Sequence, residues 1–139
     1  MDRLSNLLQS LDPAIRAPIA VSLGAIPGAL SRYYLTVFLG QRLGTSFPYG
    51  TFAANLTGTL VMGFFVTLTT ERVISSPDLR LFVAVGFLGS YTTFSSYALD
   101  AAVLLQSGTR GIALFYWLGS AVWGFLSLEL GSFLARKLP

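Results

Sequence analysis

The 139-residue chain contains neither cysteine nor histidine, and only 11% of its residues are charged. The absence of cysteine excludes disulfides and thiolate chemistry, and the absence of both residue types removes the commonest ligands of transition metals. Without histidine, the chain also lacks the usual general base of enzyme active sites. The basic residues are scattered and form no run typical of nucleic-acid binding. We therefore expect neither an enzyme nor a nucleic-acid-binding protein.

Charge is too scarce to cover a surface that faces water, since a soluble domain carries about 25% charged residues. Hydrophobic residues make up 53% of the chain, and four long stretches carry no charge: 17–31, 43–70, 81–99 and 111–128. A helix that crosses a membrane needs roughly 20 mostly apolar residues. The sequence predicts an all-α, multi-pass membrane protein in which residues 1–139 form one domain. Its four spans are expected near 18–40, 48–70, 80–105 and 111–134.

The predicted loops are short, so neighbouring helices should run antiparallel. The N-terminus, the loop 71–79 and the C-terminus are then expected on one side of the membrane. Six basic residues lie near that side and two near the other, which predicts that it is cytoplasmic, in the plasma (inner) membrane. Residues 1–16 precede the first span, and leucines recur at helical spacing within 3–11. This segment is either an amphipathic helix at the membrane interface or a frayed tail.

Glycine is abundant in the predicted spans. The stretch "GAIPGALSR" places Gly24 and Gly28 four residues apart, a spacing that lets another helix approach closely. A packing role is favoured over a ligand role, because this motif is common in spanning helices. Four helices alone make a thin bundle, so the remaining glycines suggest that further helices pack on it. The simplest source of those helices is a second copy, and we expect a homodimer in membrane lipid.

Two spans carry neutral polar stripes. Asn55 lies near the centre of the second span, with Thr51 and Thr59 on the same helical face. Tyr116 and Ser120 repeat the pattern in the fourth span. Such groups either line a polar path or form hydrogen bonds between helices, and each alone fits the second interpretation as well as the first.

The third span contains "GFLGSYTTFSSY" at 86–97, with seven hydroxyl-bearing residues and two glycines. Glycines and β-branched threonines weaken a helix, so the third helix is predicted to break near Thr92. A break at mid-membrane frees carbonyls that can coordinate a bare cation. Phe94 and Tyr97 follow on one face, and their ring edges carry partial positive charge.

The charged residues within the spans lie near the ends. Arg32 and Asp100 should lie at similar depth, either as a pair at the interface or lining one vestibule. Glu129 is expected to pair with Arg80 or Arg136. No carboxylate lies near the centre of a span, although a proton-coupled cation transporter normally needs one. Amide, hydroxyl and aromatic groups instead favour a small, tightly hydrated anion.

These motifs resemble those of the CrcB/Fluc family of fluoride channels over nearly the whole chain. The matching stretches are "GALSRYYL", "PYGTFAANLTG", "GFLGSYTTFSSY" and "YWLGS". The resemblance implies a fluoride-selective channel that exports the ion passively from the cytoplasm. It also implies a dual-topology antiparallel homodimer with a structural sodium ion (Na+) at its centre. The alternative is a small multidrug-type dimeric transporter, which would need an embedded carboxylate in an early span.

The resemblance also assigns roles to individual residues. Gly89 and Thr92 would supply backbone carbonyls to sodium, and Arg32 and Asp100 would line the vestibule. Tyr97 stands where the family usually has a second phenylalanine, and Asp100 where a glutamate is usual. The fluoride pore would be lined by Asn55, Thr93, Phe94, Ser96, Tyr97, Tyr116 and Ser120.

Overall fold

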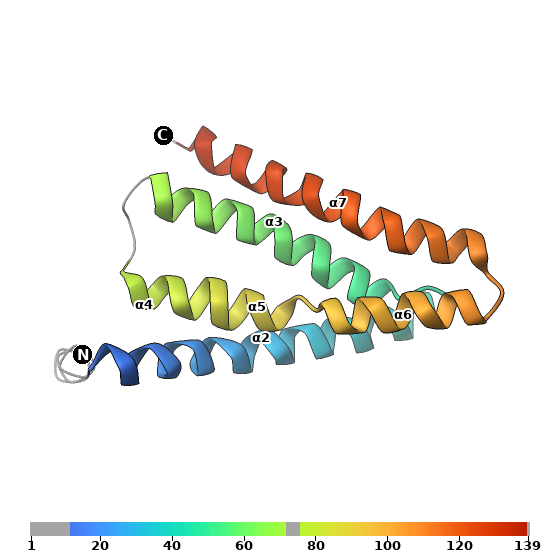
Figure 1. Ribbon diagram of the computed structural model, residues 1–139, viewed down its shortest axis with the longest axis horizontal. Helices are drawn as coiled ribbons and strands as arrows, with labels where there is room; N and C mark the ends of the chain where they lie inside the picture. The colour runs from blue at the N-terminus through green and yellow to red at the C-terminus, as the bar shows by residue number, and fades with distance from the viewer. Residues whose placement is uncertain (1–11, 72–75, 139) are drawn as a thin grey trace.

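The computed structural model describes residues 12–71 and 76–138, and these form helices joined by short loops (Figure 1). The prediction of an all-helical protein is confirmed. Three helices are unbroken: α2 (Pro13–Leu43), α3 (Tyr49–Glu71) and α7 (Arg110–Lys137). We call the four lengths of chain that run along the bundle its arms; α2, α3 and α7 are the first, second and fourth. The third arm, between α3 and α7, is divided into four shorter helices. They are α4 (Pro77–Arg80), the π-helix η1 (Leu81–Leu88), α5 (Gly89–Tyr91) and α6 (Phe94–Gln106).

The four arms run alternately in opposite directions, and the two ends of the described chain lie at the same end of the molecule (Figure 1). Within residues 12–71 and 76–138, three helices are long and apolar enough to cross a membrane, namely α2, α3 and α7. The third arm is not among them because its longest piece, α6, has only 13 residues. It nevertheless runs along the bundle as one arm, with α4 and α6 near opposite ends (Figure 1).

The first helix is longer than predicted. Asp12 caps it by accepting a hydrogen bond from the Ala14 N–H at 2.8 Å, and Pro13 occupies its first position. The predicted span began only where the charge-free run begins, so it missed this first turn. Residues 13–16 therefore belong to α2 and Asp12 caps it, while residues 1–11 of the predicted interfacial segment lie outside the described residues. The helix ends before Gly44, whose φ of +82° favours glycine.

Glycines bring two pairs of helices into backbone contact. A Cβ atom added at Gly28 would lie 2.2 Å from the Phe87 carbonyl oxygen in η1. A Cβ atom added at Gly131 in α7 would lie 2.0 Å from the Leu60 carbonyl oxygen in α3. The predicted packing role of the GxxxG motif is confirmed, and its partner is η1 of the same chain.

One end of the bundle is joined by polar side chains. Arg16 in α2 forms an ion pair with Asp78 in α4 at 3.0 Å. Arg136 in α7 pairs with Glu71 at the end of α3 at 2.9 Å, and Arg80 donates to the Thr70 hydroxyl at 2.8 Å. The predicted pairing of Glu129 with Arg80 or Arg136 is therefore wrong. The helix ends meet at this level, whereas Glu129 lies seven residues before Arg136, further inside α7.

The opposite end is packed with apolar and aromatic side chains. Ala101 and Leu104 in α6 and Ala113 and Tyr116 in α7 are buried there, and Phe47, Phe52 and Tyr97 pack against them. Elsewhere, large apolar side chains point outward: Ile26 is 61% exposed and Phe125 is 62% exposed. An apolar exterior around hydrogen-bonded helices is what a lipid environment requires.

Candidate functional site

The third arm leaves the helical conformation at Thr92 and Thr93. Thr92 has φ −81° and ψ 156°, and Thr93 has φ −152° and ψ 119°, so both are extended. Thr93 then caps α6, because its hydroxyl accepts from the Ser96 N–H at 3.3 Å. The helical winding of this arm is therefore interrupted at Thr92 and Thr93.

Asn55 in α3 bonds to both backbone groups of Thr93. Its Oδ1 accepts from the Thr93 N–H at 2.8 Å, and its Nδ2 donates to the Thr93 carbonyl oxygen at 3.1 Å. The amide thus satisfies groups that the helix break would otherwise leave unpaired. Hydrogen bonding between helices was one of the two interpretations of Asn55. The second hydrogen on Nδ2 is not used by these bonds.

The bonds of Asn55 change which donors bind the backbone carbonyl oxygens around the break. In a continuous helix the Thr93 N–H would donate to the Gly89 carbonyl, but here it donates to Asn55. The Leu88 carbonyl still accepts from the Thr92 N–H at 3.0 Å and from its hydroxyl at 2.9 Å. The Ser90 carbonyl accepts from Arg32 Nε at 3.1 Å. The Gly89 carbonyl therefore loses its helical donor, while its neighbours on either side are occupied.

A cavity of about 380 Å³ lies beside the break, between α3, the start of α6 and α7. Five of the predicted pore residues line it. They are Asn55, Thr93, Phe94, Tyr97 and Ser120. The remaining lining is formed by Thr59, Thr92, Ala121 and Gly124. Residues from three separate stretches of sequence thus converge on one space, and none of its lining side chains carries a charge.

The hydroxyls around this cavity differ in whether they already form hydrogen bonds to protein groups. The Thr59 hydroxyl donates to its own helix, at 2.9 Å from the Asn55 carbonyl oxygen. The Ser120 Oγ is buried and has no hydrogen-bond partner among the residues that the structure describes. Ser120 therefore offers the cavity a hydroxyl that protein groups do not already use.

Ser96 and Tyr116, the other two predicted pore residues, do not line the cavity. The Ser96 hydroxyl accepts from the Thr93 hydroxyl at 3.2 Å. Tyr116 is fully buried, and its hydroxyl donates to Asp100 Oδ2 at 3.2 Å. The helical spacing of Tyr116 and Ser120 did not predict this difference, because it cannot show which neighbour covers each side chain.

The two residues of the predicted vestibule each have another partner. Arg32 bonds to the Ser90 carbonyl, and Asp100 accepts from Tyr116. Within the described part of the chain, the ion pairs are those of Arg16 and Arg136, so Arg32 and Asp100 do not form the simple interfacial pair. Whether they line a vestibule stays a prediction.

Aromatic rings extend from the cavity toward the apolar end of the bundle. Ring centroids are 5.5 Å apart between Phe94 and Tyr97, between Tyr97 and Tyr116, and between Tyr116 and Phe47. Phe94, at the cavity end of this aromatic row, is 80% exposed. Tyr97 is in the middle and contacts a ring on each side.

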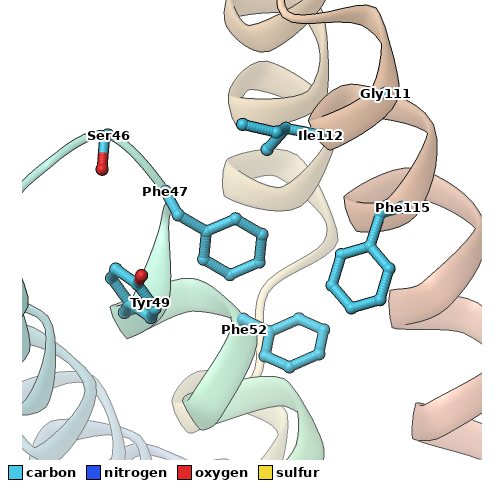
Figure 2. Close-up of a pocket in the computed structure, with 7 residues that line it drawn as sticks. All are labelled: Ser46, Phe47, Tyr49, Phe52, Gly111, Ile112 and Phe115. Carbon is cyan, nitrogen blue, oxygen red and sulfur yellow. The ribbon is translucent and has the colours of Figure 1, made fainter.

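A second cavity, of about 500 Å³, lies at the far end of this row. Figure 2 shows the rings of Phe47, Phe52 and Phe115 facing this space, with Ile112 above them and Ser46 and Tyr49 toward one side. None of the predicted site residues lines it. Its lining is mainly apolar, so the polar functional groups concentrate in the cavity beside the break.

No cluster of three or more Asp or Glu residues suited to a metal ion occurs in 12–71 or 76–138. The lining instead consists of amide, hydroxyl and aromatic groups at a helix interruption among long apolar helices. Such a fold and site define a multi-pass α-helical membrane protein with a neutral polar cavity between its helices.

Comparison with known proteins identifies the family. Residues 19–132 match the family described as CrcB-like protein, Camphor Resistance (CrcB), and the chain belongs to this family. A protein of Trichormus variabilis named fluoride-specific ion channel FluC is 58% identical over 89% of this chain and 91% of its own length. The protein of the same name from a Synechococcus species is 54% identical over 91% of this chain and 97% of its own. The family that the motifs suggested is therefore confirmed, and these relatives are named as channels rather than enzymes.

Proposed function

We propose that this chain is a fluoride-selective channel that exports the ion passively from the cytoplasm across the plasma (inner) membrane. The observation that carries the proposal is the neutral cavity beside the helix break, in a chain 58% identical to a protein named fluoride-specific ion channel. Fluoride gives up its water only where strong donors replace it.

The lining of the cavity offers such donors. Asn55 Nδ2 has one hydrogen left after its bond to Thr93, and the Ser120 hydroxyl is unused by the described protein groups. The rings of Phe94 and Tyr97 add edges with partial positive charge. Because no carboxylate lines the cavity, an anion entering it meets no like charge.

The path continues beyond the cavity in this proposal. Ser96, which bonds to Thr93, and Tyr116, which bonds to Asp100, extend the path of the ion. Arg32 and Asp100 mark the vestibule of this path in this proposal, where the guanidinium of Arg32 attracts anions.

A second copy of the chain, inserted in the opposite orientation, completes the channel. Phe94 lines the cavity yet is 80% exposed, so one wall of the cavity is open in the single chain. A Cβ atom added at Gly124 in α7 would meet nothing within 4 Å. Open small residues beside an exposed ring suit close approach by another helix, and an antiparallel homodimer supplies one.

A structural sodium ion at the centre of this dimer is part of the proposal. Unwound backbone carbonyls coordinate sodium in other membrane proteins. The Gly89 carbonyl has lost its helical donor, and Thr92 is extended at the break. These two residues from each copy would hold the ion with neutral oxygen ligands, a donor set that fits a hard monovalent cation.

The decisive experiment measures fluoride efflux and chloride efflux in parallel from liposomes that carry the purified protein. We expect fluoride to leave and chloride to be retained, with protein-free liposomes as the control. Absence of fluoride flux, or equal chloride flux, would contradict the proposal. A small multidrug-type transporter would instead move organic cations, and the cavity lacks the carboxylate that such a transporter needs.

A further inference from the structure

We propose that the Tyr97 hydroxyl fastens α6 to α7 and thereby sets the width of the neutral cavity. The hydroxyl of Tyr97 is then a positioning group for selectivity, because it holds the ring in place and does not itself contact the ion. This inference rests on the proposed function, and it concerns the hydroxyl that a phenylalanine at this position would lack.

The fastening is a short hydrogen bond between two helices. The Tyr97 hydroxyl, on α6, donates to the Trp117 carbonyl oxygen, on α7, at 2.7 Å. A second tyrosine bonds in the opposite direction: Tyr116, on α7, donates to Asp100, on α6, at 3.2 Å. The two rings lie 5.5 Å apart. Each tyrosine therefore holds the helix that carries the other.

The anchor lies beside the functional groups. Trp117 is three residues before Ser120, so the two are neighbours on the surface of α7. Because the Tyr97 hydroxyl bonds to the Trp117 carbonyl oxygen, the position of the Tyr97 ring is fixed relative to Ser120 on the same helix. The same ring supports Phe94, whose centroid is 5.5 Å away and whose other side is exposed.

The start of α6 depends on such support. The helix begins immediately after the extended residues Thr92 and Thr93, so no continuous helix fixes its position from the N-terminal side. No glycine seam joins α6 to α7 of the kind that joins α3 to α7. Side-chain bonds therefore determine how far the two helices stand apart at the level of the cavity.

Loss of the Tyr97 hydroxyl should allow α6 to move relative to α7, while the ring continues to fill its place in the cavity lining. In Tyr97→Phe the ring remains, but its anchor on Trp117 is gone. We expect the ratio of chloride to fluoride efflux to rise roughly two- to tenfold, the factor that corresponds to one net hydrogen bond. Tyr91→Phe is the matched control, because the Tyr91 hydroxyl also bonds between helices, to Thr57 at 2.9 Å, but does not line the cavity.

A second readout does not depend on conduction. The chain has no cysteine, so Ala121→Cys introduces a single thiol in the cavity wall, at a position that already carries a Cβ. We expect a water-soluble thiol reagent to modify it severalfold faster when Tyr97→Phe is also present. Gly119→Cys, outside the cavity lining, should react at an unchanged rate.

The outcomes separate the two claims. If the parent protein carries no fluoride, the proposed function fails, while the thiol rates still test the fastening. If the thiol of Ala121→Cys reacts at the same rate with and without Tyr97→Phe, the fastening is overturned. If the thiol reacts faster but the chloride-to-fluoride ratio stays unchanged, the role in selectivity is overturned.

Discussion

The helix α7 takes part in two contacts of different construction. Against α3 it packs backbone to backbone, with Gly131 against Leu60 and Gly63 against Leu128. Against α6 it packs through side chains, with two tyrosine hydroxyls and a row of rings. The glycine contact admits no adjustment, since any added atom collides. The side-chain contact encloses the cavity, so its geometry depends on a few rotatable groups.

The largest effect is expected from breaking the rigid contact. Gly131→Ala puts a methyl group 2.0 Å from the Leu60 carbonyl oxygen, so α3 and α7 must separate. We expect destabilisation of about 3 kcal/mol or more and loss of folded protein in thermal unfolding followed by size-exclusion chromatography. Gly119→Ala on the same helix is the control, because its Cβ meets nothing nearer than 3.6 Å. Equal stability of the two variants would refute the distinction.

The next effect concerns the link between α3 and the helix break. Asn55→Ala leaves the Thr93 N–H and carbonyl without their partner, at a cost of about 1–3 kcal/mol for each unsatisfied group. We expect fluoride efflux to fall at least tenfold while the dimer still forms, measured on liposomes and by cross-linking. Thr69→Val on the same helix should retain flux, because that hydroxyl bonds only to its own helix at Val66. Unchanged fluoride efflux in Asn55→Ala would contradict the place of Asn55 in the pore.

A smaller effect is expected from removing the proposed cation. Purification with a large organic cation in place of sodium should reduce flux or loosen the dimer, because the Gly89 and Thr92 carbonyls would then face one another without a positive charge. Readdition of sodium should restore both. Unchanged flux and an unchanged dimer after exhaustive exchange would count against the ion.

The smallest effect should come from the charged end of the bundle. Glu71→Gln weakens the pair with Arg136, whose side chains are 49% and 57% exposed. Exposed pairs contribute about 0.2–1 kcal/mol, so a slight fall in thermal stability is expected. The chloride-to-fluoride ratio should not change, since this pair lies away from the cavity. A changed ratio would show that the ion pair at the far end of α7 affects selectivity at the cavity.

Much of this architecture could be predicted from local sequence. The charge-free runs located α2, α3 and α7, because this signal depends on neighbouring residues. Five predicted pore residues proved to surround one cavity, since polar groups between apolar helices must gather where they can be satisfied. Tyr116 and Ser96 are not part of that lining, because tertiary packing decides which side chain is covered.

Partners were harder to predict than positions. Arg136 pairs with Glu71 rather than Glu129 because the helix ends meet at that level, which depends on where each helix begins. The partner of Tyr97 is a backbone carbonyl, and every residue carries one, so no sequence pattern could single out Trp117. The bonds of Asn55 to the backbone of Thr93 could not be predicted either, because every residue other than proline carries the same backbone groups.

The π-helix η1 makes the third arm tolerant of losing one residue. A π-helix closes its hydrogen bonds one residue later than an α-helix, so the chain spends an additional residue there. Deleting one residue within 81–88 would let the segment return to α-helical winding with little net rotation of the residues downstream, because a π-helix turns less per residue than an α-helix. Thr93 would then keep its place against Asn55. The side chain at Gly86 is less free to change than the length, since a Cβ atom there would collide with the Val21 carbonyl oxygen of α2.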